Sequence, residues 1–255
     1  LGTNDVALTN TYSGGTTVSA GILLGSAQNN SIFGTGSITI SSGTGNLWLN
    51  RNSITNNIVN NGGKITLDNG FGSSISGTIT NNAALAVDVM YANQTLSGII
   101  SGTGSLTLVQ TAGGGNLILT AANTYTGTTT ISSGKLILKG SLAAGSAVSV
   151  VGGSLTGPDT TGASATVSGT IAVTSASAAI VQPGAFGNNT LNTGALTFSG
   201  TLAAFIANST TTTFSKVAVT GNVALGAMDI TCPAGITTNG TYKIITATGT
   251  MSGTL

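Results

Sequence analysis

Short segments of this chain repeat, and this self-similarity constrains the fold more than any other feature of the sequence. Residues 34–40 (GTGSITI) recur as 102–108 (GTGSLTL), and residues 45–50 (GNLWLN) are followed by a matching copy at 115–120 (GNLILT). A longer pair consists of NTYSGGTTVS and NTYTGTTTIS, which begin at Asn10 and Asn123. Repeats of this kind are typical of solenoids, in which each unit buries its apolar face only by stacking on its neighbours.

The repeated units have the pattern of short β-strands. Segments such as 37–40, 64–67, 106–108 and 135–139 mostly alternate apolar and polar residues and are bounded by Gly, Asn or Ser. In the last of these, Leu136 and Leu138 share one face, while Lys135, Ile137 and Lys139 share the other. The spacing of about 8–12 residues between strands would also fit a β-sandwich or a barrel.

The residue types at the turns favour stacked parallel coils over those alternatives. Asn and Gly tolerate left-handed backbone conformations, and Asn and Thr side chains can form hydrogen-bonded ladders between equivalent positions of successive coils. We therefore expect an all-β fold, a parallel β-solenoid, with about 20–25 residues in each coil.

The composition excludes several other classes of protein. Thr, Ser, Asn and Gly make up 135 of the 255 residues, and charged residues make up 4%. These residues have poor helix propensity, so the composition disfavours a helical protein. Hydrophobic residues make up 40% of the chain and charged residues are few, so the composition also disfavours intrinsic disorder. A net charge of +1 gives no basic stripe for nucleic acid, and no stretch approaches the 18 uninterrupted apolar residues of a membrane-spanning helix.

Residues 123–136 (NTYTGTTTISSGKL) resemble the autotransporter-associated β-strand repeat, which reads roughly NTYTGGTTIxxGxL. Thr128 departs from the Gly of that pattern, and the copy at 10–24 keeps Gly14 and Gly15 but is one residue shorter. The C-terminal third is similar to the segment that closes many autotransporter passenger domains, in its elements 182–184, 214–221, 240–247 and 251–255. The resemblance implies a right-handed, single-stranded parallel β-helix that is exported across the outer membrane and displayed or released.

We expect a single β-solenoid over residues 1–255. Residues 1–142 carry the repeats of autotransporter type, and residues 143–255 form the C-terminal closing part, with 143–180 the segment that resembles the family least. Leu1 falls part-way into a repeat unit, which we interpret as trimming at that end of the chain.

No catalytic, cofactor-binding or metal-binding residue can be assigned from the sequence. The chain has no His and no Glu, so a Ser-His-Asp or Cys-His site cannot be built. Stacking could bring Asp68 and Asp88 together. The simpler interpretation of Asp68 and Asp159 is that they are turn residues. The simpler interpretation of Asp88 is an outward-facing position in a strand. The other carboxylates are scattered, at Asp5 and Asp229.

A few other residues carry the remaining hypotheses for a site. We predict that Tyr12 and Tyr125 pack at equivalent corners, with ligand stacking as the alternative, and that Trp48 is a core residue rather than a sugar-binding platform. Cys232 is predicted to be a small buried hydrophobe, with a linking or reactive thiol as the alternative. The Thr runs 128–130 and 210–213 lack the strict Thr-x-Thr spacing that a flat ice-binding array requires.

Together these observations predict a structural or adhesive bacterial surface protein without catalytic activity and without a cofactor. One alternative is a subunit that assembles end to end into an extracellular filament or sheath, because the ends of a solenoid expose strand edges. Another alternative is a module that binds carbohydrate or a host surface. The expected partners are accordingly other copies of the chain, surface glycans or a host surface, and not nucleic acid.

Overall fold

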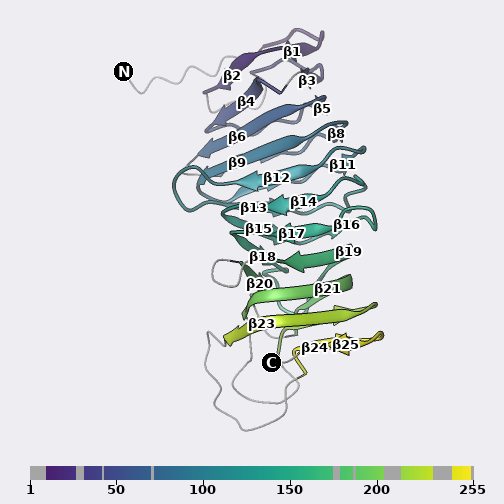
Figure 1. The fold of residues 1–255 in the computed structure, drawn as a ribbon. Coiled ribbons are helices and arrows are strands. Elements are labelled where there is room, and N and C mark those ends of the chain that lie inside the picture. The colour runs from purple at the N-terminus through teal and green to yellow at the C-terminus, as the bar shows by residue number, and fades with distance from the viewer. Residues whose placement is uncertain are drawn as a thin grey trace. The chain divides into compact units, whose positions relative to one another are not determined.

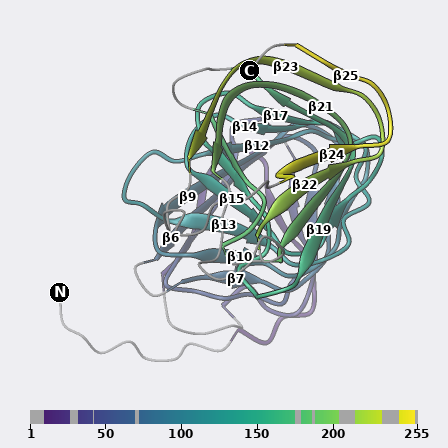
Figure 2. The same cartoon turned by 90° about the horizontal axis from the view of Figure 1, so that it is seen from below.

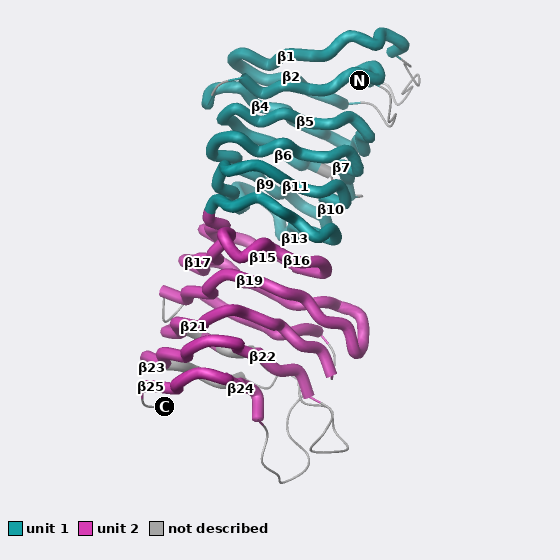
Figure 3. Tube along the Cα trace, turned by 90° about the vertical axis from the view of Figure 1, so that its right-hand side faces the viewer, with its two compact units in different colours: residues 1–127 teal, residues 128–255 magenta. Residues whose placement is uncertain are grey.

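The structure is a computed structural model, and it describes residues 10–26, 32–41, 43–69, 72–174, 179–185, 188–203, 214–231 and 243–253. Throughout these residues the regular elements are β-strands joined by turns, and none is a helix. The predicted all-β, parallel β-solenoid fold is confirmed. The chain divides into two compact units, residues 1–127 and 128–255, which are described separately (Figure 3). The division expected at 142/143 stays a prediction.

The first unit contains three rows of parallel strands, and in Figure 1 the strands of a row lie one above the other. One row contains β1 (Thr16–Val18), β3 (Ile38–Ile40), β5 (Ile58–Asn60), β8 (Ile79–Asn81) and β11 (Ile100–Ser101). The second contains β2 (Gly21–Gly25), β4 (Gly45–Asn50), β6 (Gly63–Asn69), β9 (Leu85–Tyr91) and β12 (Leu106–Val109). The third contains β7 (Ser74–Ile75), β10 (Gln94–Leu96) and β13 (Asn116–Leu119).

The second unit follows the same principle with longer strands. Its short strands are β14 (Thr129–Ile131), β15 (Lys135–Leu138), β16 (Ser141–Leu142), β17 (Val148–Val150), β18 (Ser154–Thr156) and β20 (Ile180–Gln182). Its long strands are β19 (Ser164–Val173), β21 (Thr190–Ala203) and β23 (Val223–Thr231), and β19 and β21 pair in parallel with a register irregularity between Val167 and Thr170. Toward the end of the chain β22 (Lys216–Val219) pairs with β24 (Ile245–Ala247), and β23 with β25 (Met251–Ser252), as Figure 2 shows.

Alternation along each strand determines which side chains form the core. In the second row of the first unit, Leu47 pairs with Ile65, Ile65 with Val87, and Val87 with Leu108. All four side chains are buried, so each coil places an aliphatic residue directly on that of the coil before it. In the second unit Leu136 and Leu138 are fully buried and Lys135 is partly exposed, which confirms the predicted facing of this strand.

Coil length, taken from one residue to its partner on the next coil, differs between the two units. In the first unit Ile38 pairs with Ile58, and Ile58 in turn pairs with Ile79. The predicted coil of about 20–25 residues describes these and most other pairings of that unit. In the second unit Val217 pairs with Ile245, so the coil between them is longer.

The expected ladders of amide side chains are present in the first unit. Asn60 pairs in register with Asn81, and its Nδ2 donates to Asn81 Oδ1 at 2.7 Å with both side chains fully buried. On the surface the next residues repeat this contact, since Asn82 Nδ2 donates to Asn61 Oδ1 at 3.0 Å. A buried amide is stable only when it is hydrogen-bonded, so the ladder fixes the register of the coils.

Glycines lie where one corner passes closest to the coil before it. A Cβ added to Gly77 would overlap the carbonyl oxygen of Asn56, and one added to Gly98 would overlap that of Gly77. The same relation joins Gly127 to Gly104. The recurrence of Gly at this point of the repeat therefore has a steric cause rather than a need for unusual backbone angles.

A core substitution should affect stability far more than a neighbouring outward one. We expect Leu136→Asp to lower the free energy of unfolding by at least about 3 kcal/mol, because it buries an unpaired carboxylate among stacked aliphatic residues. Lys135→Ala is the matched control and should change it by less than about 0.5 kcal/mol. Denaturation in urea followed by circular dichroism measures both, and equal midpoints would contradict the assigned facing.

Whether a glycine tolerates substitution by Ala should depend on how close the neighbouring atoms lie to the added Cβ. Gly98→Ala should destabilise the protein by about 1–3 kcal/mol, because its methyl group has no room beside the Gly77 carbonyl. Gly14→Ala, where an added Cβ meets no atom within 4 Å, should leave the melting temperature nearly unchanged. A thermal melt in which Gly14→Ala loses as much stability as Gly98→Ala would show that close coil packing is not the reason for the glycine.

Candidate functional site

The outward side chains of β4, β6 and β9 form a polar cluster on the first unit. Strand pairing aligns them in columns, with Asn46 beside Lys64, Trp48 beside Thr66, and Thr66 beside Asp88. We call this surface the outer β4–β9 face and define it by Asn46, Trp48, Asn50, Lys64, Thr66, Asp68, Asp88 and Thr111. It contains the single Trp of the chain and two of its five Asp residues.

Trp48 lies on this outer face and not in the core. Leu47 and Leu49 are fully buried, and the alternation of the strand directs Trp48 outward, where it is partly exposed. The prediction of a core residue, which rested on the match with Ile118, was therefore wrong. Ile118 is also on the outward side of its strand but is covered to 8% exposure, so the two copies differ in what covers them.

Hydrogen bonds fix the position of the indole ring. Trp48 Nε1 donates to Asp68 Oδ2 at 3.2 Å, and Asn50 Nδ2 donates to the same oxygen at 3.2 Å. Because Asp68 is on the neighbouring strand, the first of these bonds holds the indole across the outer surface of β6. Asp68 is within strand β6, so its interpretation as a turn residue was wrong as well.

The two carboxylates of the face are not brought together as a catalytic pair. In the register of β6 and β9, Asp88 lies beside Thr66 and Asp68 beside Met90, which offsets the two Asp residues by two positions. Each also has its own partners, since Asp68 accepts from Trp48 and Asn50 while Asp88 accepts from Lys64. The arrangement orients side chains but does not offer the clustered carboxylates of a glycosidase or lyase site.

Asp88 is fully buried, although its position in the strand faces outward as predicted. Lys64 Nζ lies 2.6 Å from Asp88 Oδ2, and Thr111 donates to the carboxylate through its backbone N–H at 3.1 Å and its Oγ1 at 2.9 Å. Thr111 follows β12, so the segment after that strand folds over Asp88 and excludes water. A buried carboxylate requires such compensation by a cation and hydrogen bonds.

The segment over Asp88 is held by two further contacts. Gln110 Nε2 donates to the carbonyl oxygen of Gly115 at 2.7 Å, which closes the segment on itself. Gly113 has a φ of 77° and lies so close to the backbone of Tyr91 that a Cβ would collide with it. No local pattern in the sequence indicates this cover, because Thr111 and Asp88 belong to different coils.

The remaining predicted site residues are dispersed. Tyr125 is fully buried, as expected for a corner residue, whereas Tyr12 is 40% exposed and its hydroxyl is 2.6 Å from Thr16 Oγ1. Asp159 lies in a bend and forms an exposed ion pair with Lys139 at 2.7 Å. Thr129 of the run 128–130 is buried and contacts Ser146 Oγ at 3.0 Å, so this run is not a flat surface array.

Several predicted positions fall outside the described residues, namely Asp5, Cys232, the run 210–213 and the side chain of Asp229. Among the residues that are described, no group of three or more His, Cys, Asp or Glu side chains could hold a metal ion. Likewise, no helix in the described ranges has the length and hydrophobicity that a membrane span requires.

The parallel coils, the stacked aliphatic core and the amide ladder define a β-solenoid built of repeats. Residues 1–24 and 109–138 match the family model of the passenger-associated transport repeat. These two segments contain both copies of the motif that begins at Asn10 and Asn123, so the resemblance of these repeats is confirmed, and the repeats together with the solenoid fit an autotransporter passenger repeat domain. The resemblance of the C-terminal third to a closing segment stays a prediction. No curated protein and no solved structure matches the chain significantly.

The two ion pairs of the described chain should differ sharply in their effect on stability. Asp88→Ala should lower the free energy of unfolding by about 3–5 kcal/mol, because it leaves a half-buried Lys64 and the Thr111 N–H without their acceptor. Asp159→Ala removes an exposed pair and should cost less than about 1 kcal/mol. Urea denaturation of both variants makes the comparison, and a loss for Asp159→Ala that equals the loss for Asp88→Ala would contradict the structural role of the buried carboxylate.

Proposed function

We propose that the chain is the displayed part of an exported bacterial surface protein, a non-catalytic solenoid with a structural and adhesive role. The observation that carries this proposal is the match to the passenger-associated transport repeat in a chain whose coils form a parallel solenoid. The family suggests export to the cell surface, and the apolar stacked interior provides a scaffold in which each coil is stabilised by its neighbours.

The arrangement of charged groups supports a role without catalysis. Three Asp residues each have a different partner. Asp68 accepts a hydrogen bond from Trp48. Asp88 forms an ion pair with Lys64, and Asp159 forms one with Lys139. Hydrolytic and lyase β-helices act through carboxylates or cations gathered at one place. The scaffold positions isolated polar groups along its outer faces, which suits recognition of a surface better than turnover of a substrate.

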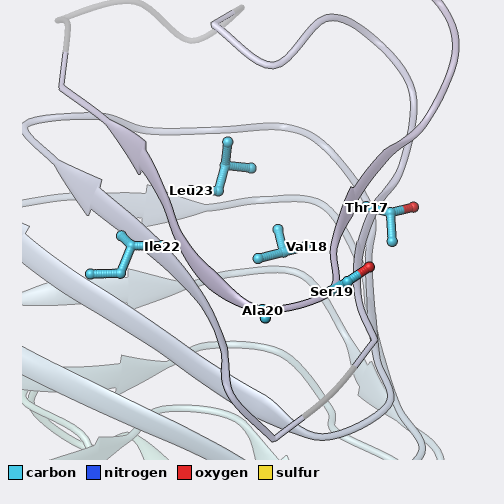
Figure 4. Close-up of a pocket in the computed structure, with 6 residues that line it drawn as sticks. All are labelled: Thr17, Val18, Ser19, Ala20, Ile22 and Leu23. Carbon is cyan, nitrogen blue, oxygen red and sulfur yellow. The ribbon is translucent and has the colours of Figure 1, made fainter.

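A second candidate function is assembly through the first coil. Within the described residues, β1 pairs only with β3 and β2 only with β4, so one edge of each strand has no described partner. Ile22 and Leu24 of β2 are 60% and 53% exposed, and Ile22 also lines a hollow of about 280 Å³ together with Val18 and Leu23. Figure 4 shows Val18 and Leu23 on the inner side of the β2 ribbon and Ile22 on its other side. Exposed edges and apolar side chains of this kind favour pairing with another chain.

Localisation on intact cells tests the primary proposal. We expect antibodies against the chain to label unpermeabilised producing cells, or the protein to be recovered from the medium, because the repeat family suggests export. Negative-stain electron microscopy of the same native material should show separate particles that are free or anchored at one end. A cytoplasmic protein from the same cells, labelled only after permeabilisation, is the control.

Other outcomes of this experiment would change the proposal. Labelling confined to permeabilised cells would contradict display at the surface. Filaments of uniform width would favour the assembly function, and they should then disappear in the variant Leu24→Asp. A glycosidase, lyase or protease activity that one Asp substitution abolishes would contradict the non-catalytic role.

A further inference from the structure

We propose that the outer β4–β9 face is a binding site for a neutral glycan, with Trp48 as the stacking platform and Asp68, Asn50 and Asn46 as hydrogen-bonding partners. This inference rests on the proposed adhesive function and assigns it to one place on the solenoid. Three observations carry it: the partial exposure of the only indole in the chain, the hydrogen bond that orients its ring, and polar atoms beside it without a hydrogen-bond partner among the described residues.

Trp48 leaves part of its large apolar ring exposed on this face. It continues a row of exposed apolar side chains, since the register places Leu24 directly beside Trp48 and Ile22 beside Asn46. Exposed apolar groups that adjoin one another on a soluble scaffold mark interaction surfaces more often than single exposed residues do. An indole also combines a large apolar face with a polar edge, which matches a sugar ring that has apolar C–H faces and a hydroxyl rim.

The polar groups around the indole are already held in place. Asp68 Oδ2 accepts from both Trp48 and Asn50, but no described residue donates to Asp68 Oδ1. Asn46 Oδ1 accepts from Thr66 Oγ1 at 3.2 Å, and in the described ranges nothing accepts from Asn46 Nδ2 or donates to Asn50 Oδ1. One free donor and two free acceptors therefore flank the indole, on strands whose positions the coil ladder fixes. Such preorganisation lowers the entropic cost of binding.

The charge of the face favours a neutral ligand. Lys64 pairs with the buried carboxylate of Asp88, and the exposed Arg51 directly follows Asn50, so two cations and two carboxylates lie on or next to this face. Without an excess of cations, the face has no electrostatic preference for sulfated or carboxylated sugars. The exposed apolar row also has only three side chains, on two neighbouring strands. A stable protein interface needs a much larger surface, roughly 800 Å² or 20–30 residues on each partner. A short stretch of neutral sugar rings fits these conditions better than a folded protein.

The single Trp makes the site directly observable. We would titrate the full chain with neutral hexasaccharides of β-linked glucose, α-linked glucose, N-acetylglucosamine and mannose, following indole emission, with a heparin hexasaccharide as the anionic comparison. We expect a saturable emission change with at least one neutral hexasaccharide, with a Kd of about 0.1–1 mM, and none with heparin. By calorimetry, Trp48→Ala and Asp68→Ala should weaken that binding by about tenfold or more, the loss expected for a stacked ring or a charged hydrogen bond.

Tyr91→Asn provides the matched control. Tyr91 is 56% exposed on the adjacent coil and has a φ of 55°, which Asn tolerates, so this variant removes an exposed aromatic ring from outside the proposed site. Its affinity for the hexasaccharide should equal that of the wild type. Circular dichroism melts of all variants would establish that they remain folded. A flat emission response to every neutral hexasaccharide, a stronger response to heparin, or full binding by Trp48→Ala would each overturn the proposal.

An adhesion assay separates this inference from the proposed function. Beads coated with the wild type or with Trp48→Ala are applied to cell surfaces that have been treated with glycosidase, treated with protease, or left untreated. Adhesion by both proteins alike would retain the adhesive function and overturn the Trp48 site. Adhesion that depends on Trp48 and is abolished by protease but not by glycosidase would replace the glycan with a protein partner. Adhesion by neither protein would refute the adhesive function itself.

Discussion

The parallel backbone ladder between successive coils is the constraint on which the rest of this structure depends. In the first unit each strand pairs in register with the corresponding strand of the next coil, so inward residues lie above inward residues and outward residues above outward ones. This places Leu47, Ile65 and Val87 in one inner column and Trp48, Thr66 and Asp88 in the adjacent outer column. A slip of one residue would exchange the two columns and bury polar groups throughout. The buried pair of Asn60 and Asn81 opposes such a slip, since it is satisfied only in the observed register.

The same ladder explains where glycine is required and where coil length can vary. Coils that stack at the spacing of a β-sheet leave no room for a Cβ at their tightest corners, as at Gly77 and Gly98. The number of residues in a coil can change only where a strand is longer or where a segment between strands loops outward from the sheet. The long strands β19, β21 and β23 show the first way in the second unit, and the segment that covers Asp88 shows the second way in the first unit. An outward loop of this kind changes the surface locally and leaves the strand pairing intact.

The fold could be predicted from the sequence because its determinants are local and repeated. Alternation in segments such as 135–139 identifies the strands, their facing and the apolar interior. The site residues were harder to predict because their surroundings are set by other coils. The match with Ile118 suggests a core position for Trp48, although the alternation of Trp48 with Leu47 and Leu49 indicates the outer face. The burial of Asp88 could not have been inferred, since its cover comes from Thr111 in the next coil, and no local pattern records how that segment folds.

A repeated scaffold of this kind carries little information about function in its interior, because the inner columns are constrained only to be apolar and to stack. Function must then be specified by the few outer residues that depart from the Thr, Ser, Asn and Gly background. With 4% charged residues and one Trp in 255 residues, such departures are rare in this chain. The outer β4–β9 face combines several of them within three strands, and the ladder that stabilises the coils also holds their side chains in fixed columns. The rigidity that the solenoid needs for stability is thus the property that lets a small set of outer residues act together as a recognition surface.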